Sequence, residues 1–323
     1  MRCQSKRYIS VFGLVAFTVA VFALPTSAQP GPPVHPTVYV NCSLHPNTLH
    51  TLQEAVNSAG AGSMIEVCAG NFTENVSVAL AGLQIVGEEA VTLRCPHYGV
   101  GSGFDLFAIN VTIQGFDISN CASAISVEPG FGRGLFTQNS LHNNTTGISI
   151  NISSGDNSVI NNAIYGNSEF GVLDYQPLGD YITSNTVQGN GYGIDVSTTG
   201  FSADGGGCPL TSAVISGNEV VGNSMDGVLL NNADCGNVKQ NVLSANGEDG
   251  LQLIASTDSV ITANTADGNR NDGIELNSAS TLNSIVNNTM QMNKEFDAAD
   301  HGTGNTWTNN HCKTISGDAV CVH

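Results

Sequence analysis

The chain has 323 residues. It contains nine lysines and arginines but 27 aspartates and glutamates, which gives a formal charge of −18 at pH 7. This balance argues against nucleic acid as a ligand, because binding to a phosphate backbone depends on lysine and arginine. It would also repel an acidic polysaccharide unless divalent cations bridged the two.

The first 28 residues have the pattern of a secretory signal peptide. Three basic residues precede an apolar run over residues 9–24, and Thr26 and Ala28 supply small residues for cleavage. The run is short for a membrane span, and no later stretch is as apolar. We therefore expect a secreted or periplasmic monomer without a membrane span after cleavage, carrying six basic and 27 acidic residues.

Residues 29–48 are expected to form an N-terminal extension, and a short helix follows it. The stretch TLQEAVNSAG, residues 51–60, places four apolar side chains on one face of a helix that Gly60 would end. We expect this helix to cover the first coil of the repeat described next. Residues 64–78, 83–87, 91–95 and 111–121 are then predicted as the early strands.

An asparagine pair, Asn-x-x-x-x-Asn, recurs along the chain from residue 139 onward. It occurs at 139/144, 162/167, 185/190, 218/223, 241/246, 264/269 and 288/293. The spacings are 23, 23, 33, 23, 23 and 24 residues, and the long interval contains an insertion of about ten residues, TTGFSADGGGCPL. The register resumes unchanged after this insertion, which indicates a structural repeat.

Three apolar positions recur within each unit. One lies two residues after the first asparagine: Leu141, Ile164, Val187, Val220, Leu243, Ala266 and Met290. A second follows a glycine: Ile148, Val172, Ile194, Val228, Leu251 and Ile274. A third lies near Val159, Ile182, Val214, Val238, Val260 and Ile285. Three short apolar segments separated by Asn and Gly predict three strands and three turns per coil.

Such a unit cannot bury its apolar face alone, so successive coils are expected to stack with parallel strand pairing. The pattern predicts an all-β solenoid of roughly ten coils over residues 49–312, followed by a tail with a cysteine loop over 313–323. Asparagine suits the turns because it tolerates left-handed backbone geometry and its amide can bond to the amide one coil away. Leucine-rich, helical and calcium-binding nonapeptide repeats fit the period and composition less well.

Eight cysteines follow the signal peptide, an even number that favours disulfides in an oxidising compartment. Their order suggests the pairs Cys42 with Cys68, Cys95 with Cys121, Cys208 with Cys235, and Cys312 with Cys321. The first three separations are close to the repeat length, but sequence alone leaves the connectivity open.

Three aspartates recur at one corner of consecutive coils: Asp226, Asp249 and Asp272. Stacking predicts a column of carboxylates about 4.8 Å apart. Charges this close must raise one another's pKa, turn into solvent or gather a cation such as Ca²⁺. Solvated turn aspartates are the more common arrangement, and a calcium site is the alternative hypothesis.

The run TLQEAVNSAGAGSMIEVCAGNFTENVSV, then LQIVG and the Asn-rich coils, resembles secreted right-handed parallel β-helix proteins of the pectate-lyase-like superfamily. The resemblance covers roughly residues 49–312 and implies a single-stranded right-handed parallel β-helix that engages carbohydrate. That superfamily includes lyases, hydrolases, esterases and epimerases. The signature blocks of pectin methylesterases, polygalacturonases and typical pectate lyases are absent here, which disfavours these three activities.

One fragment, YGID at residues 192–195, resembles the start of the Tyr-Gly-Phe/Ile-Asp-Pro-His motif of alginate epimerases and related β-helix enzymes. The resemblance implies that Tyr192 transfers a proton and that Asp195 is its carboxylate partner. Val196 and Ser197 replace the Pro-His of the motif, so the expected histidine is missing. An ordinary glycine turn of the repeat explains the same four residues.

The insertion suggests a binding groove, because an irregular loop on a regular scaffold often carries function. It places Asp204 near Asp195, and we expect Asp174, Tyr192 and Asn231 to line the same groove. A surface bulge without ligand is the alternative. Near the C-terminus, Asp297, Asp300 and His301 suggest either a metal site or an exposed turn.

These observations favour a protein that engages extracellular polysaccharide. The enzymatic hypothesis is a uronan lyase or C5-epimerase that uses Tyr192, Asp195 and Asp204, with Ca²⁺ offsetting charge repulsion. The alternatives are carbohydrate binding without turnover and a structural spacer at the cell surface.

Overall fold

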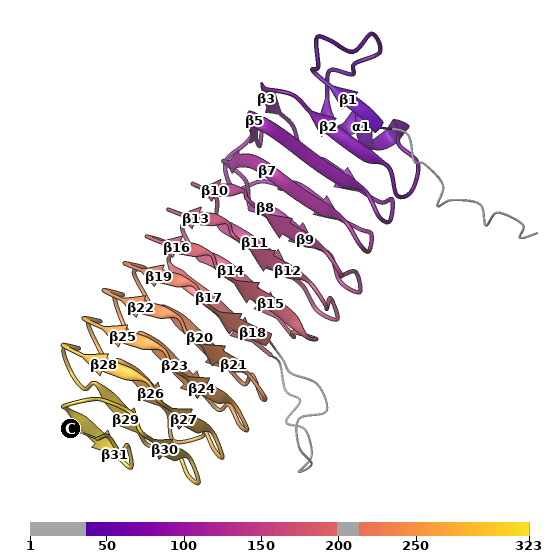
Figure 1. Ribbon diagram of the computed structural model, residues 1–323. Helices are drawn as coiled ribbons and strands as arrows, with labels where there is room; N and C mark the ends of the chain where they lie inside the picture. The colour runs from indigo at the N-terminus through magenta and orange to yellow at the C-terminus, as the bar shows by residue number, and fades with distance from the viewer. Residues whose placement is uncertain (1–36, 199–212, 323) are drawn as a thin grey trace, which may run out of the picture. The chain divides into compact units, whose positions relative to one another are not determined.

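The computed structural model describes residues 37–198 and 213–322, which all belong to the unit His35–His323. The expected signal peptide, Asp204 and Cys208 lie outside the described residues. Within the described unit, strands stack coil upon coil from β1 to β31 (Figure 1). Every strand pairing is parallel, as the repeat predicts.

Each coil contributes strands to three strips. One strip is an eleven-stranded sheet among the described residues, which we call sheet B. Its strands are β4 (Val76–Val78), β6 (Ser102–Leu106), β8 (Ser123–Val127), β11 (Thr146–Ile150), β14 (Phe170–Tyr175), β17 (Tyr192–Ser197), β20 (Val228–Asn231), β23 (Leu251–Ile254), β26 (Ile274–Leu276), β29 (Ala298–Asp300) and β31 (Ile315–Gly317). About eleven turns are therefore present where the repeat predicted roughly ten.

The other two strips are the arms of one sheet, joined through the long strands β5 and β7. Arm 1 contains β1 (Thr37–Val40), β2 (Met64–Val67), β5 (Gln84–Arg94), β7 (Thr112–Ser119), β9 (Leu135–Thr137), β12 (Ser158–Ile160), β15 (Asp180–Thr183), β18 (Ala213–Ser216), β21 (Asn237–Lys239), β24 (Val260–Thr262), β27 (Ser284–Val286) and β30 (Thr306–Thr308). Arm 2 contains β3 (Gly70–Thr73), β10 (Ser140–His142), β13 (Ala163–Tyr165), β16 (Thr186–Gln188), β19 (Glu219–Val221), β22 (Val242–Ser244), β25 (Thr265–Asp267) and β28 (Thr289–Gln291).

The N-terminal helix forms where the sequence predicts it. Helix α1 (Leu52–Ser58) buries Leu52, Ala55 and Val56, and the Thr51 hydroxyl accepts the Glu54 N–H at its start. The Glu74 carboxylate accepts two further N–H groups of the first turn. The stack also includes part of the stretch before the helix, because β1, which lies within the expected extension, pairs in parallel with β2.

The core consists of aliphatic columns, one residue per coil. The first two predicted columns are fully buried, as are Val159, Ile182, Val238 and Ile285 of the third. Two members of the third column were predicted one residue too early. Ile215 and Ile261 take the inward positions in register with Ile182 and Val238, whereas the side chain of Val260 is 43% exposed.

The paired asparagines form two buried ladders along the coils. In each ladder the Nδ2 group donates to Oδ1 of the equivalent asparagine in the next coil, over 2.9 to 3.1 Å. Both ladders cross the insertion, from Asn185 to Asn218 and from Asn190 to Asn223. The left-handed backbone was predicted at these asparagines, but it lies one residue earlier, at residues such as Ser184 and Gln240. The buried amide satisfies backbone groups, and the residue before it makes the bend.

Three of the four predicted disulfides are present: Cys42–Cys68, Cys95–Cys121 and Cys312–Cys321. Cys235 is also disulfide-bonded. Among the described residues, no helix has the length and apolar character needed to cross a membrane.

Carboxylates satisfy the backbone at the C-terminal end. Asp297 accepts the N–H groups of Lys313 and Thr314, and Asp300 accepts the indole N–H of Trp307 at 2.7 Å. Both aspartates are buried whereas His301 is exposed, so the exposed turn expected here is wrong for the two aspartates. Their backbone hydrogen bonds, which hold the pKa of Asp297 below its ordinary value despite burial, explain the difference.

Candidate functional site

A column of side chains forms the corner that leads into sheet B, and it contains both Tyr192 and the three repeated aspartates. The rings of Phe170 and Tyr192 stack at 5.5 Å in adjacent coils. The Gly193 N–H donates to the Asp226 carbonyl, so Asp226 occupies the place of Tyr192 one coil further on. Asp249 and Asp272 follow in the next two coils. We call these five residues the corner column.

The aspartates of the corner column are buried. Their side chains are at most 4% exposed. The solvated turn aspartates that the sequence analysis gave as the more common arrangement are therefore wrong for these positions. Asp226 accepts the Asp249 N–H at 2.9 Å, Asp249 accepts the Asp272 N–H at 2.6 Å, and Asp272 accepts the Phe296 N–H at 2.8 Å. Each carboxylate therefore satisfies the backbone of the next corner through one oxygen.

Burial makes these carboxyls weak acids. It is the main cause that raises the pKa of Asp226 to about 7, of Asp249 to about 8 and of Asp272 to about 6. The negative charge of Glu275 raises all three pKa values further, and that of Glu248 raises the pKa of Asp226. A hydrogen bond with Glu275 also favours the protonated form of Asp249, so Asp249 keeps a proton near neutral pH.

A second column faces outward from sheet B beside the first, in the order Leu173, Asp195, Leu229, Gln252 and Glu275. The Gln252 amide donates to Asp249 at 3.1 Å and to Glu275 at 2.6 Å, which joins the two columns. The Ser197 hydroxyl donates to the Asp195 carboxylate. Burial raises the pKa of Asp195.

Tyr192 lies at the rim of this surface and is half-buried. Desolvation raises its pKa, and the charges of Asp226, Glu248 and Asp195 raise it further. The phenol therefore keeps its proton at neutral pH. This environment suits a proton donor better than a phenolate base.

Three carboxylates are placed where they can hold a metal ion. One oxygen each from Asp249, Asp272 and Glu275 lies within 4.8 Å of the others. An all-oxygen, anionic donor set suits a hard cation such as Ca²⁺. A cation there would replace the proton that Asp249 otherwise holds. Asp226, the third predicted ligand, lies one coil away beside Tyr192.

The structure brings together part of the groove predicted around the insertion. Asn231 pairs in register with Ser197 on the strand next to Tyr192 and Asp195. Asp174 instead points into the core, between Ile150 and Val196 of one interior column. Its carboxyl is fully buried and has no hydrogen-bond partner among the described residues, and burial raises its pKa well above the ordinary value. The inward parity of β14 at this position explains why it does not line a groove.

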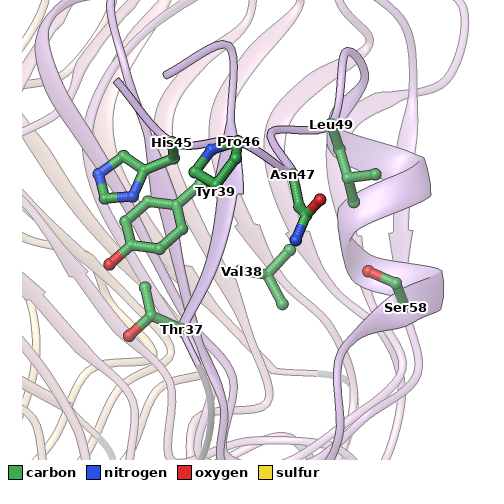
Figure 2. Close-up of a pocket in the computed structure, with 8 residues that line it drawn as sticks. All are labelled: Thr37, Val38, Tyr39, His45, Pro46, Asn47, Leu49 and Ser58. Carbon is green, nitrogen blue, oxygen red and sulfur yellow. The ribbon is translucent and has the colours of Figure 1, made fainter. Parts of the chain in front are cut away.

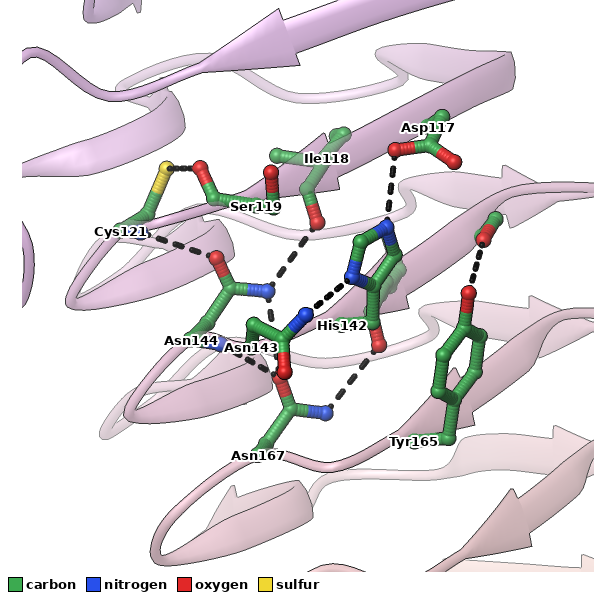
Figure 3. A network of polar contacts seen from close by, with 11 residues as sticks. Asp117, Ile118, Ser119, Cys121, His142, Asn143, Asn144, Tyr165 and Asn167 are labelled. Atoms are coloured by element: carbon green, nitrogen blue, oxygen red, sulfur yellow. Dashed lines mark hydrogen bonds and ion pairs between the residues drawn. The ribbon is translucent and has the colours of Figure 1, made fainter.

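A polar network that the sequence analysis did not predict lies on arm 2 (Figure 3). The Asn143 amide donates to His142 Nδ1 at 2.8 Å, and His142 Nε2 donates to Asp117 at 3.0 Å. Tyr165 stacks on the imidazole at 4.9 Å. Both ring nitrogens are therefore engaged, which favours a structural role over that of a free base. The network forms because β7, β10 and β13 pair in register, and no local sequence motif indicates it.

A pocket of 380 Å³ lies at the N-terminal end of the stack, between β1, the following loop and the end of α1 (Figure 2). Tyr39 and His45 stack at 3.5 Å on one side, and Val38 and Leu49 reach the core on the other. It is far along the chain from the two columns. We interpret it as the open end of the interior columns.

Comparisons with known proteins agree with this architecture. Residues 179–320, less than half of the chain, match the family described as periplasmic copper-binding protein (NosD). The A-module of the mannuronan C-5 epimerase AlgE4 from Azotobacter vinelandii has a similar structure, with a TM-score of 0.59 and 17% identity over 84% of this chain and 91% of that one. Pectate lyase Pel9A has a TM-score of 0.50 and 15% identity over 86% of this chain and 79% of that one.

At these identities the structural similarity establishes the fold, and the chain has the parallel β-helix fold of the pectate-lyase-like proteins. None of the curated proteins matches the chain in sequence. The activity must therefore be argued from the site itself.

Proposed function

We propose that the chain acts on an extracellular uronic-acid polymer as a lyase or C5-epimerase, at the two columns on sheet B. The observation that carries this proposal is the group formed by Tyr192, Asp195 and Asp226 in adjacent coils. There a protonated phenol lies beside carboxyls whose pKa values are raised. Enzymes that move protons at carbon need acids and bases tuned in this way. The parallel β-helices of a mannuronan epimerase and a pectate lyase support the choice of substrate class.

The roles follow from the protonation states. Asp195, as the carboxylate, would take the C5 proton of the uronate, and Tyr192 would supply a proton. In an epimerase, the phenol returns a proton to C5 from the opposite face. In a lyase, the electrons of the broken C5–H bond form the C4=C5 double bond, the C4–O bond breaks, and the departing oxygen takes the proton. Asp204 remains a predicted third member of the site.

We further propose that Ca²⁺ binds at Asp249, Asp272 and Glu275. The chain is strongly acidic, so a uronate carboxylate would be repelled from this surface without a cation. The matched family is described as copper-binding. The all-carboxylate donor set found here suits calcium better than copper, which favours nitrogen and sulfur ligands. Export to a calcium-rich, oxidising compartment agrees with the signal-like first 28 residues and the disulfides.

Binding without turnover is the second candidate function. Ser197 stands where the epimerase motif has histidine, and its hydroxyl donates to Asp195. A surface that has lost a proton-transfer residue can still hold the polymer. A spacer at the cell surface has no specific support from this site.

Proton NMR of uronans incubated with the protein in D₂O tests the proposal. Polymannuronate and polygalacturonate, each with Ca²⁺, should lose the C5 proton signal, and a lyase should add olefinic signals. Tyr192→Phe should lower the rate at least about 100-fold, the scale of general acid–base catalysis. Retarded migration in uronan-containing gels without exchange would select the binding function, and neither exchange nor retention would reject both.

A further inference from the structure

A second pocket, of 240 Å³, lies on the turns that follow β8, β11 and β14. Phe131 and Arg133 come from the first turn, Asp156 from the second and Leu178 from the third. None of these residues belongs to the corner column or to the outward column of sheet B.

One wall of this pocket is apolar and exposed. The Phe131 ring meets Phe107 edge to face at 6.3 Å. Phe107 is 43% exposed, Ile109 is 39% exposed and Leu178 is 47% exposed. A gathering of exposed apolar side chains around a hollow marks a contact surface more often than isolated ones do.

The other wall carries Arg133, whose ion pair with Asp156 is weak. Arg133 Nε lies 3.6 Å from Asp156 Oδ2, and the two side chains are 62% and 68% exposed. An exposed pair at this distance contributes little, and the guanidinium keeps other N–H groups for a ligand. Arg133 has a left-handed backbone with φ of 59°, and its N–H donates to the Gly155 carbonyl at 2.8 Å. The turn therefore fixes the backbone position of Arg133.

We propose that this pocket binds one carboxylate-bearing sugar ring. The Arg133 guanidinium would pair with the carboxylate, and Phe131 would cover the apolar face of the ring. The pocket is smaller than the roughly 300 Å³ at which sites for larger ligands begin, which fits a single ring. In a chain this acidic, a positive group beside an aromatic wall is the complement of an anionic, partly apolar ligand.

The pocket lies on the turns that follow the strands of sheet B, whereas the corner column lies where these strands begin. Along the stack, the turn after β8 is three coils from β17, or about 14 Å. A polymer laid along the coils would reach both places, so the pocket would anchor the chain beside the reacting residue. This second role rests on the proposed function, whereas binding of a single acidic sugar does not.

Amide NMR titration with galacturonate, with galactose as its neutral counterpart, tests the proposal. Galacturonate should shift resonances of residues 130–133 and 153–156, and galactose should bind at least about tenfold more weakly. Arg133→Gln should weaken galacturonate binding by about tenfold or more. Asp156→Asn should strengthen it, because the variant removes a competing and repelling carboxylate. Arg94→Gln removes an equally exposed positive charge elsewhere and should leave the affinity unchanged.

Equal binding of galactose and galacturonate, or unchanged affinity in Arg133→Gln, would overturn the proposal, as would shifts confined to other turns. The two proposals fail separately. Asp195→Asn should abolish C5 exchange while galacturonate still binds the pocket. Exchange that persists without pocket binding would reject this inference alone.

Discussion

The ladder asparagines act as backbone ligands inside the coils. Asn241 accepts from the backbone N–H and the side-chain amide of Asn218, and it donates to Asn264 and to the Ile215 carbonyl. A buried polar group without its partner costs about 1–3 kcal/mol. Asn241→Ala leaves the Asn218, Asn264 and Ile215 groups that Asn241 contacts without this partner.

We therefore expect Asn241→Ala to lower the free energy of unfolding by about 3 kcal/mol. Chemical denaturation would measure this loss. Asn71→Ala, at an exposed asparagine of β3, should change stability by less than about 0.5 kcal/mol. Equal small effects at both positions would show that the ladder contributes no stability.

Asp174 is the opposite case, a carboxyl placed where other coils have aliphatic side chains. Replacing it with valine should stabilise the fold by about 2 kcal/mol, because an unpartnered buried polar group disappears. The gain should increase with pH. The raised pKa means that the folded state holds a proton that the unfolded state has released, so stability falls as pH rises above about 4. Denaturation of Asp174→Val at pH 5 and pH 8 checks both points, and a loss of stability at both would contradict them.

At the scale of an element, the corner column should make the fold sensitive to pH. The folded-state pKa values of about 7, 8 and 6 exceed the ordinary value near 4. The folded state therefore binds more protons than the unfolded state, and stability decreases as pH rises from about 4 to 8. Thermal unfolding in the presence of a chelator should show this decrease, and Asp249→Asn should reduce its slope.

Calcium should act in the opposite direction on the same element. A cation at Asp249, Asp272 and Glu275 needs their carboxylates ionised, so binding competes with protons. Added Ca²⁺ should raise the melting temperature at pH 8 more than at pH 5. Mg²⁺ at equal concentration is the matched control, because it requires a stricter geometry. An equal response to calcium in Asp249→Asn and the unaltered chain would exclude this site.

At the scale of the whole described unit, the 23-residue period was sufficient to predict the stacked coils, because buried apolar and asparagine positions repeat with it. It also brought Asp226, Asp249 and Asp272 to one corner. Counting from the asparagines misses Tyr192, because that coil is one residue shorter at its corner, whereas counting from the glycines before Ile194 and Val228 places Tyr192 level with Asp226. The placement of Asp174 in a groove overlooked strand alternation, because Val172 points inward and Asp174, two residues later in β14, therefore points inward as well. Non-periodic side chains such as Arg133 and His142 gain neighbours only through the register between coils.

In-register stacking gathers Asp226, Asp249 and Asp272 into one buried group whose pKa values are raised. Carbon-13 NMR titration of the side-chain carboxyls measures this directly. We predict that Asp272, Asp226 and Asp249 titrate near pH 6, 7 and 8, and that Asp226→Asn lowers the pKa of Asp249. Independent titration of all three near the ordinary aspartate value of about 3.9 would contradict the account.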